Sequence, residues 1–249
     1  MNSLQMMMGA CSVADSEPTA GPFSFEVKTA AADTFQLPIY SGGTYDFHVD
    51  WGDDSSSDIT AYDDAAANHS YSGAGTYNVE ITGTSLIGWR FNNAGDKLLI
   101  YDISQWGILD VGNLNGYFYG CSNLTISATD GLNCPNTTDF SYCFYKCTGI
   151  TAIPTGLFDE CTLVTDFFYC FRSCTGINTD LPSNLILYNV EIDVCSYMFY
   201  GCASMTGDGT AFCDQATTHG VTTTNFCFTG CTSLPDYDDI PAAFGGGGN

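Results

Sequence analysis

Apolar residues follow a helical spacing in the second half of the chain. Phe140, Cys143, Phe144 and Cys147 lie at positions i, i+3, i+4 and i+7, and the same spacing starts again at Phe167. This spacing places the four side chains on one face of a helix. The pattern therefore predicts a helical turn in each of these segments.

A short extended segment follows the helical turn. Residues 150–153 read Ile-Thr-Ala-Ile and stop at Pro154, which cannot continue the hydrogen bonding of a strand. One unit of a helical turn and a strand cannot bury its own apolar face, so several units must stack.

Five copies of this unit follow one another. Each contains the motif Phe-x-x-Cys, and the steps between the motif cysteines are 26, 27, 28 and 29 residues. The motif cysteines are Cys121, Cys147, Cys174, Cys202 and Cys231. The sequence therefore predicts a five-unit α/β solenoid over residues 117–236.

Apolar and polar residues alternate with a period of two before the repeats. Phe47, Val49 and Trp51 have polar neighbours, and clusters of Gly, Asp, Ser and Asn separate such runs. This pattern is typical of a small β-sandwich, which we place at 22–87. The remaining segments are an N-terminal anchoring arm (1–21), a connector and solenoid cap (88–116) and an acidic, Gly-rich tail (237–249).

The charge of the chain excludes two classes of partner. There are 28 acidic and five basic residues, which gives a net charge of −23. Such a surface repels phosphate backbones and anionic lipid, so we expect neither nucleic-acid nor membrane binding. The start of the chain lacks the basic segment of a signal peptide. A weak similarity of Met8-Gly-Ala-Cys11 to a lipoprotein cleavage box leaves a lipoprotein as an alternative.

The first predicted domain contains a recognisable turn. Residues 45–55 read Tyr-Asp-Phe-His-Val-Asp-Trp-Gly-Asp-Asp-Ser, and His69-Ser-Tyr71 follows. Together they resemble the polycystic-kidney-disease (PKD) type β-sandwich domain, which implies an immunoglobulin-like sandwich. Asp54 replaces the second glycine of the family's turn, and Asp tolerates left-handed dihedral angles better than most residues.

The repeats resemble a second family. Residues 153–177 contain Ile-Pro-x-Gly-Leu-Phe-Asp-x-Cys and then Phe-x-Tyr-Cys-Phe-x-x-Cys, which is similar to the BspA-type leucine-rich repeat of bacterial surface proteins. Units four and five depart from it, since Leu157-Phe158 becomes Leu185-Ile186 and then Ala211-Phe212. The predicted fold class is multidomain, with an N-terminal all-β PKD-like sandwich and a C-terminal leucine-rich-repeat α/β solenoid.

This pair of domains resembles the small accessory virion proteins of tailed phages, marine ones in particular. The resemblance implies a non-enzymatic decoration, stabilisation or host-contact protein on the capsid or tail surface, present in many copies. We expect Leu4, Met6, Met7 and Met8 to dock on other virion proteins, because Met adapts to irregular grooves. The solenoid would contact a host glycan or protein. The alternative is a bacterial cell-surface adhesin or lipoprotein that binds host protein or glycan.

The cysteines occupy apolar positions. Cys143/Cys147 and two similar pairs are spaced i, i+4, and the first member is replaced by Tyr117 or Met198 in other units. A position that accepts Tyr, Met or Cys is a core position, where a free thiol is a small hydrophobe. Disulfides between neighbouring units and a metal site are the alternatives.

The sequence predicts no catalytic, metal or cofactor site. The acidic turn of Asp50, Asp53, Asp54 and Asp58 offers oxygen ligands suited to calcium, but it lacks the glycine and terminal Glu of a calcium loop. We interpret His69 as structural. Trp51, Trp89 and Trp106 are interpreted as core anchors. No phosphate-binding or dinucleotide-binding glycine loop is present, and no carboxylate pair supports a carbohydrate-active enzyme.

Overall fold

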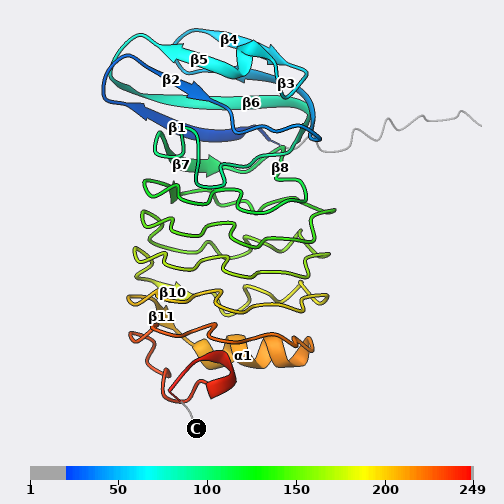
Figure 1. Ribbon diagram of the computed structural model, residues 1–249, viewed down its shortest axis with the longest axis vertical. Coiled ribbons are helices and arrows are strands. Elements are labelled where there is room, and N and C mark those ends of the chain that lie inside the picture. Colours follow the sequence, from blue (N-terminus) through cyan, green and yellow to red (C-terminus); the bar gives the residue numbers. More distant parts are fainter. Residues whose placement is uncertain (1–20, 248–249) are drawn as a thin grey trace, which may run out of the picture.

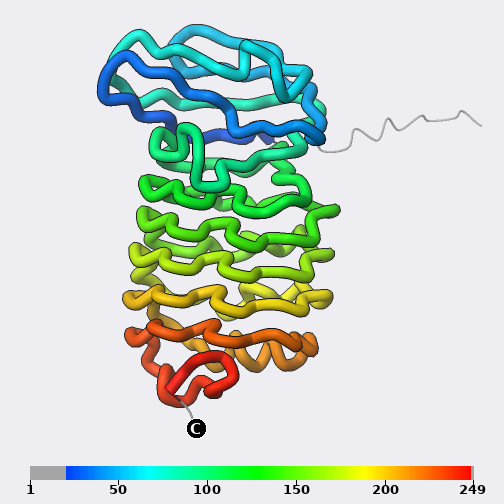
Figure 2. Tube along the Cα trace, in the orientation of Figure 1, coloured from blue at the N-terminus to red at the C-terminus, as the bar shows by residue number. Residues whose placement is uncertain are grey.

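The computed structural model describes residues 21–247 and shows a β-sheet at one end of an elongated stack of turn-rich coils (Figure 1). The chain enters at the sheet and passes down through the coils in sequence order (Figure 2). The two ends of the described chain therefore lie at opposite ends of the stack.

Seven strands form one mixed sheet in the order β4-β3-β6-β1-β7-β9, with β8 paired to β6. The strands are β1 (Phe23–Thr29), β3 (Thr44–Asp50), β4 (Ser56–Ile59), β6 (Gly75–Ile87), β7 (Ile100–Gln105), β8 (Leu109–Asp110) and β9 (Thr125–Ile126). A separate antiparallel pair is formed by β2 (Asp33–Gln36) and β5 (Asn68–Tyr71), which follows the 3-10 helix η1 (Ala65–Ala67).

The alternation before the repeats is confirmed in β3. Its odd-numbered residues, Tyr45, Phe47 and Val49, are buried, and their neighbours are exposed. Trp51 continues the buried face directly after the strand, and Trp89 and Trp106 are also fully buried, as predicted for core anchors.

The sheet continues into the coils without a break. β1 lies between β6 and β7, and β7 pairs in parallel with β9. The Trp106 ring contacts Phe118 of the first Phe-x-x-Cys unit edge-on, with ring centroids 5.7 Å apart. One hydrophobic core therefore runs from the sheet into the stack.

The predicted helical turns are absent from the repeats. In the second unit, Tyr142 and Lys146 have φ angles of 58° and 61°. A residue in the left-handed region ends a right-handed helix, so the segment forms consecutive tight turns. The N–H groups of Cys143 and Cys147 bond to the carbonyl groups three residues earlier.

Alternate N–H groups join each coil to the next. Between units two and three the donors are Phe140, Tyr142, Phe144 and Lys146, and the acceptors are Asp166, Phe168, Cys170 and Arg172. Isolated parallel bridges link Asp139, Asp166, Val194 and Thr223 in successive coils. Backbone polar groups are thus satisfied without helices or long strands.

Regular elements are sparse below the sheet. They are β10 (Asp180–Leu181), β11 (Thr206–Gly207), the helix α1 (Gly209–Thr218) and the 3-10 helix η2 (Ala242–Phe244). Asp208 caps α1, since its carboxylate accepts from the Ala211 N–H at 2.8 Å.

The predicted fold class is wrong. The described residues contain a single α-helix, α1, instead of one helical turn per unit, and 150–153 is not a strand. The expected PKD-like sandwich is a seven-stranded mixed sheet with a two-stranded pair beside it, and this sheet includes β7, β8 and β9 from beyond residue 87. The leucine-rich-repeat α/β solenoid is replaced by mostly irregular coils, because left-handed residues interrupt the segments that had helical spacing.

Candidate functional site

Two left-handed residues per unit orient the outward-facing side chains. The first is Gly116, Tyr142, Tyr169, Tyr197 or Phe226, with φ between 57° and 62°, and the second lies four residues later. A non-glycine residue in this region costs about 1–2 kcal/mol. Four of the five units nevertheless carry an aromatic residue at the first position.

These aromatic residues form a continuous stack on one face. Tyr142, Tyr169, Tyr197 and Phe226 stack with ring centroids 5.0, 4.9 and 5.0 Å apart. Tyr119 and Tyr145 stack beside them at 4.7 Å. We define the aromatic strip as Tyr119, Tyr142, Tyr145, Phe168, Tyr169, Tyr197, Tyr200 and Phe226.

The strip is partly open to solvent. Phe226 at its lower end is 49% exposed, and the other members are half-buried. An aromatic pair contributes about 0.5–1.5 kcal/mol beyond area burial, so stacking roughly offsets the cost of the left-handed backbone. The result is a row of rings held in fixed positions by the coils.

Arg172 lies within the strip. It occupies the position of Tyr119, Tyr145 and Tyr200 in other units, and its Cζ lies 4.5 Å from the ring centroids of both Tyr169 and Tyr200. Lys146 lies 5.0 Å from the Tyr145 ring centroid. Both cations are within reach of a cation–π attraction.

The opposite side of the same turns forms the core. Phe118, Phe144, Phe171, Phe199 and Phe228 stack with centroids 5.2–5.8 Å apart. Within the motif, the Phe and Cys side chains therefore point into the core, and the Tyr side chains between them point outward.

The cysteines are core thiols, as predicted from their pattern. The twelve cysteines that the structure describes are all free and buried. Burial raises the pKa of Cys147 and Cys174 well above its ordinary value, which makes these thiols poor nucleophiles. The thirteenth cysteine, Cys11, lies outside the described residues.

These thiols also make an interaction that the pattern did not predict. The Cys174 Sγ donates to the Phe144 carbonyl in the preceding coil at 2.9 Å, and Cys147 donates to Phe118 at 3.0 Å. Cys202 and Cys231 repeat this contact at 3.1 and 3.0 Å. Each acceptor carbonyl already receives the N–H of the cysteine in its own motif.

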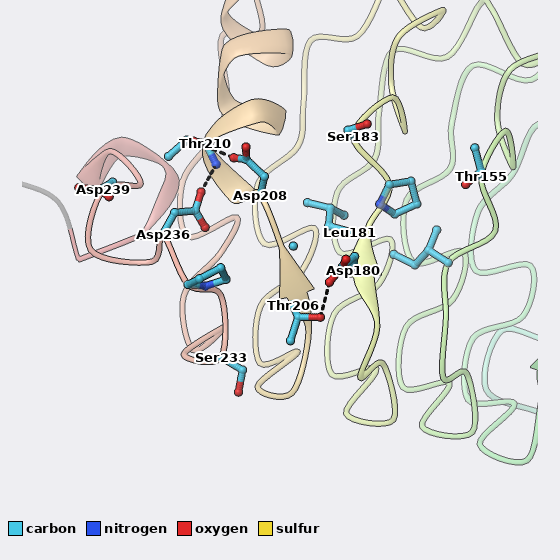
Figure 3. A pocket seen from close by; sticks show the side chains of 14 residues that line it. Thr155, Asp180, Leu181, Ser183, Thr206, Asp208, Thr210, Ser233, Asp236 and Asp239 are labelled. Carbon is cyan, nitrogen blue, oxygen red and sulfur yellow. Dashed lines mark hydrogen bonds between the residues drawn. The ribbon is translucent and has the colours of Figure 1, made fainter.

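A groove of about 960 Å³ is lined by residues of β10, β11 and the start of α1, none of which belongs to the aromatic strip (Figure 3). Its polar lining includes four carboxylates, Asp180, Asp208, Asp236 and Asp239. Leu181, Pro182 and Pro235 contribute apolar surface.

Three of the groove carboxylates have structural partners. Asp236 accepts from the N–H of Thr210 at 2.7 Å and of Gly209 at 3.2 Å. Asp180 accepts from the Thr206 hydroxyl at 2.7 Å, and Asp208 is the cap of α1 (Figure 3). A hydrogen bond from the Ala211 N–H, followed by the Thr210 hydroxyl, lowers the pKa of Asp208. Three of the four carboxylates are therefore accounted for by hydrogen bonds within the fold, and two of these, Asp208 and Asp236, bond to the start of α1.

The acidic turn near Trp51 is also structural. Asp50 accepts from the Gly52 N–H, and Asp53 accepts from Ser55 and from His69 Nε2 at 2.9 Å. Burial opposes ionisation of Asp53, but the bonds from Ser55 and His69 outweigh it and lower its pKa. The predicted structural role of His69 is confirmed, since its ring also stacks on Trp51 at 4.7 Å.

Asp54 occupies the left-handed region, with φ of 66°, as expected for the position of a glycine. Asp58 instead pairs with His48 at 2.7 Å on the exposed surface. Within residues 21–247, no three His, Cys, Asp or Glu side chains converge in a way that could hold a metal ion.

The predicted docking residues Leu4, Met6, Met7 and Met8 lie outside the described residues. The aromatic strip was missed, although its signal is visible in the sequence. Tyr recurs at fixed offsets from Phe-x-x-Cys, in Tyr-Cys-Phe-Tyr and Tyr-Met-Phe-Tyr. The interpretation of the apolar spacing as helical concealed this signal, because a helix would not align these residues in one row.

The fold and the strip define a class of protein, one in which turn-rich repeats stack beneath a mixed sheet and present aromatic side chains on one face. The chain belongs to the family described as "Mycoplasma protein of unknown function, DUF285", whose model matches residues 89–212 and again 158–237, more than half of the chain in all. No curated protein and no solved structure matches it. Within the described part of the chain, no helix is long and apolar enough to cross a bilayer.

Proposed function

We propose that this protein is a non-enzymatic structural and binding protein that engages its partner through the aromatic strip. The observation that supports this proposal is the strip itself, which is a large, partly exposed set of aromatic rings on a rigid support. Tyr and Arg are the residues that most often contribute the binding energy of interfaces. Their side chains are already ordered here, so little conformational entropy is lost on binding.

The packing of the strip also favours a binding role over a purely structural one. The stacked phenylalanines and the thiol–carbonyl bonds already join the coils from the inside. Four of the eight strip residues, Tyr142, Tyr169, Tyr197 and Phe226, lie on backbone positions where glycine would be unstrained, as Gly116 shows in the first unit. They add a chemically uniform outer surface to coils whose cores are complete.

We place this module on the surface of a phage virion, in several copies, as a decoration, stabilisation or host-contact protein. This location rests on the resemblance found in the sequence. The segment with Leu4, Met6, Met7 and Met8 would contact the capsid or tail, and the strip would face outward toward a host surface.

A bacterial cell-surface adhesin is the second candidate. The family description favours it, because it refers to proteins of Mycoplasma, a bacterium. Mass spectrometry of purified particles and of the mature N-terminus separates the two. Recovery of the chain in particles supports the virion location, whereas a lipid on Cys11 supports the adhesin and overturns the virion location.

The binding role is tested with a double variant of the strip, Tyr169→Gly with Tyr197→Gly. Glycine suits the φ angles of 60° and 57° at these positions, so the coils should persist. The matched control is Tyr188→Gly, because Tyr188 is 51% exposed and lies off the strip. The labelled proteins are titrated onto envelope preparations from the source organism and its host.

We expect the double variant to bind at least about tenfold more weakly, which corresponds to about 1.4 kcal/mol. The control should bind like the unaltered protein, and circular dichroism should show both variants folded. Equal binding by the double variant and the unaltered protein would contradict the proposal.

A further inference from the structure

We infer that the aromatic strip binds an extended acidic polysaccharide, a β-linked polymer with a carboxylate on each sugar. This inference rests on the proposed function, since it names the partner of the same surface. Two observations support it: the Lys and Arg side chains that lie along the strip, and the spacing of the aromatic rings.

Three of the five basic residues of the chain lie along the strip. Lys146 and Arg172 contact its rings. Lys97 lies one coil above Tyr119, and a Cβ on Gly120 would be 3.0 Å from its Cδ and Cε. In a chain of net charge −23, this concentration of positive charge distinguishes the strip from the remaining surface.

These cations lack acidic partners. Within residues 21–247, Lys28 is the Lys or Arg residue whose side chain forms an ion pair, and its partner is Glu26 on the sheet. Lys97 donates to the Asn93 carbonyl. Burial raises the pKa of Tyr142, neighbouring tyrosines add to the rise, and Arg172 opposes it. Carboxylates border the strip without pairing with its cations: Asp166 accepts from the N–H of the strip residue Phe168, and Asp139 accepts from the N–H of Ser141.

The way in which the rings are packed limits the kind of ligand. Tyr142, Tyr169 and Tyr197 cover one another's faces, so their edges and hydroxyl groups are the parts available for contact. A single-stranded nucleic acid needs free ring faces for its bases and many phosphate contacts. The strip offers hydrogen-bonding hydroxyls with a few cations instead, which suits the hydroxyl and carboxylate groups of an acidic sugar.

The repeat distance favours a polysaccharide over a peptide. Successive rings are 4.9–5.0 Å apart along the strip. An extended peptide places same-side residues about 6.6–6.8 Å apart, so it falls out of step with the rings after two or three coils. In an extended β-(1→4)-linked chain the rise per sugar is similar to the ring spacing and successive sugars turn over, so the carboxylates on one side recur at about every second ring and stay in step with the coils.

The experiment is a calorimetric titration of the full chain with polymannuronate at about 0.15 M salt, where a Debye length of about 8 Å screens the repulsion from the acidic surface. The comparison ligands are esterified polymannuronate, which keeps the sugars but removes the charge, and polyglutamate, which keeps the charge on a peptide. The variant is Lys146→Gln with Arg172→Gln, and the control is Lys28→Gln.

We expect polymannuronate to bind, and esterification or the double substitution to weaken binding by at least about tenfold. Lys28→Gln should have no effect. Polyglutamate that binds as tightly through the same two cations would overturn the polysaccharide assignment but leave the proposed function intact. If no polymer binds but the double variant Tyr169→Gly with Tyr197→Gly still abolishes envelope binding, the polysaccharide assignment is likewise overturned and the proposed function stays intact. Failure of both experiments would overturn both proposals.

Discussion

At the scale of single residues, four of the five motif cysteines, Cys147, Cys174, Cys202 and Cys231, serve two purposes. Each buried side chain fills the core, and each thiol hydrogen occupies the second lone pair of a phenylalanine carbonyl in the preceding coil. A comparison of Cys121 with Cys174 separates these contributions. Both side chains are fully buried, but of the two thiols only that of Cys174 donates to a carbonyl of the preceding coil.

We therefore expect Cys174→Ala to lower the free energy of unfolding more than Cys121→Ala does, by about 0.5–1 kcal/mol, the net value of one hydrogen bond. The volume removed is the same in both variants. Urea denaturation followed by circular dichroism measures the difference. Equal losses would show that the thiol contributes through packing alone.

Asp166 gives a prediction about pH. Burial raises its pKa, the bond from the Phe168 N–H opposes the rise, and Asp139 and Asp193 add to it. The folded chain thus holds this proton more tightly than the unfolded chain. The resulting destabilisation is complete above the folded-state pKa and disappears as the pH falls below the unfolded value of about 3.9.

Asp166→Asn removes the charge and keeps an oxygen that accepts from Phe168. We expect the variant to be more stable than the unaltered protein near neutral pH, and the difference to shrink toward zero below about pH 3.9. Denaturation midpoints across this range test it. Asp58→Asn, on the exposed surface, is the control. A stabilisation that does not change with pH would contradict the explanation.

The residue pattern could predict burial but not backbone conformation. Phe144 and Cys147 point inward as expected from their spacing. A period of i, i+3, i+4 also fits turns of the kind seen here, and nothing in the apolar pattern distinguishes the two. Of the ten left-handed positions in the five units, six are occupied by Tyr, Lys, Ser or Phe and four by Gly, so the usual signal of a helix break is absent at Tyr142 and Lys146.

At the scale of elements, strand prediction succeeded where alternation was long and failed where segments were short. β3 and β6 have alternating side chains over several residues. β10 and β11 have two residues each, which is too short for any periodicity, and their pairing depends on the stacking of distant coils. The aromatic strip likewise exists only once the coils are in register.

The helix α1 depends on its two acidic caps. Asp208 satisfies the Ala211 N–H, and Asp236, from the following coil, satisfies Gly209 and Thr210. Loss of a helix cap typically costs about 1 kcal/mol. We expect Asp236→Ala to cost at least as much as Asp208→Ala, because it also removes a link between two coils.

Thermal unfolding of both variants measures these losses, with Asp239→Ala, from the same groove, as the control. Because hydrogen bonds lower the pKa of Asp208 in the folded state, its contribution is present above the unfolded pKa and is lost as the pH falls through the folded value. Equal stability of all three variants would contradict the capping role.

At the scale of the whole molecule, the sheet and the coils share strands and a core. β1 is paired on one side with β6 and on the other with β7, which belongs to the segment leading into the coils. Trp51 reports on the sheet, and Trp106 contacts both the sheet residue Phe23 and the coil residue Phe118.

We therefore expect one unfolding transition for residues 21–247. Tryptophan fluorescence and far-ultraviolet circular dichroism should give the same denaturation midpoint. A fragment that ends at residue 87 should not fold, because β1 would lose β7 and the aromatic residues around Phe23 would be exposed. Two separate transitions, or a stable fragment, would contradict this prediction.

The hydrogen bonds between the coils have one further consequence, which concerns electric fields. Under the aromatic strip, at residues 140–146 and the matching residues of the other coils, the inter-coil N–H donors point toward the C-terminal end and the acceptor carbonyls point back toward the sheet. The N–H groups of Asp166 and Val194, at the edge of the strip, point the other way. The aligned peptide dipoles under the strip add, as they do in a helix. Lys97 lies at the carbonyl end of this array, and Asp236, Asp238 and Asp239 follow the last coil at the N–H end. The strip therefore has an electrostatic polarity along its length, which the charges at its two ends complement.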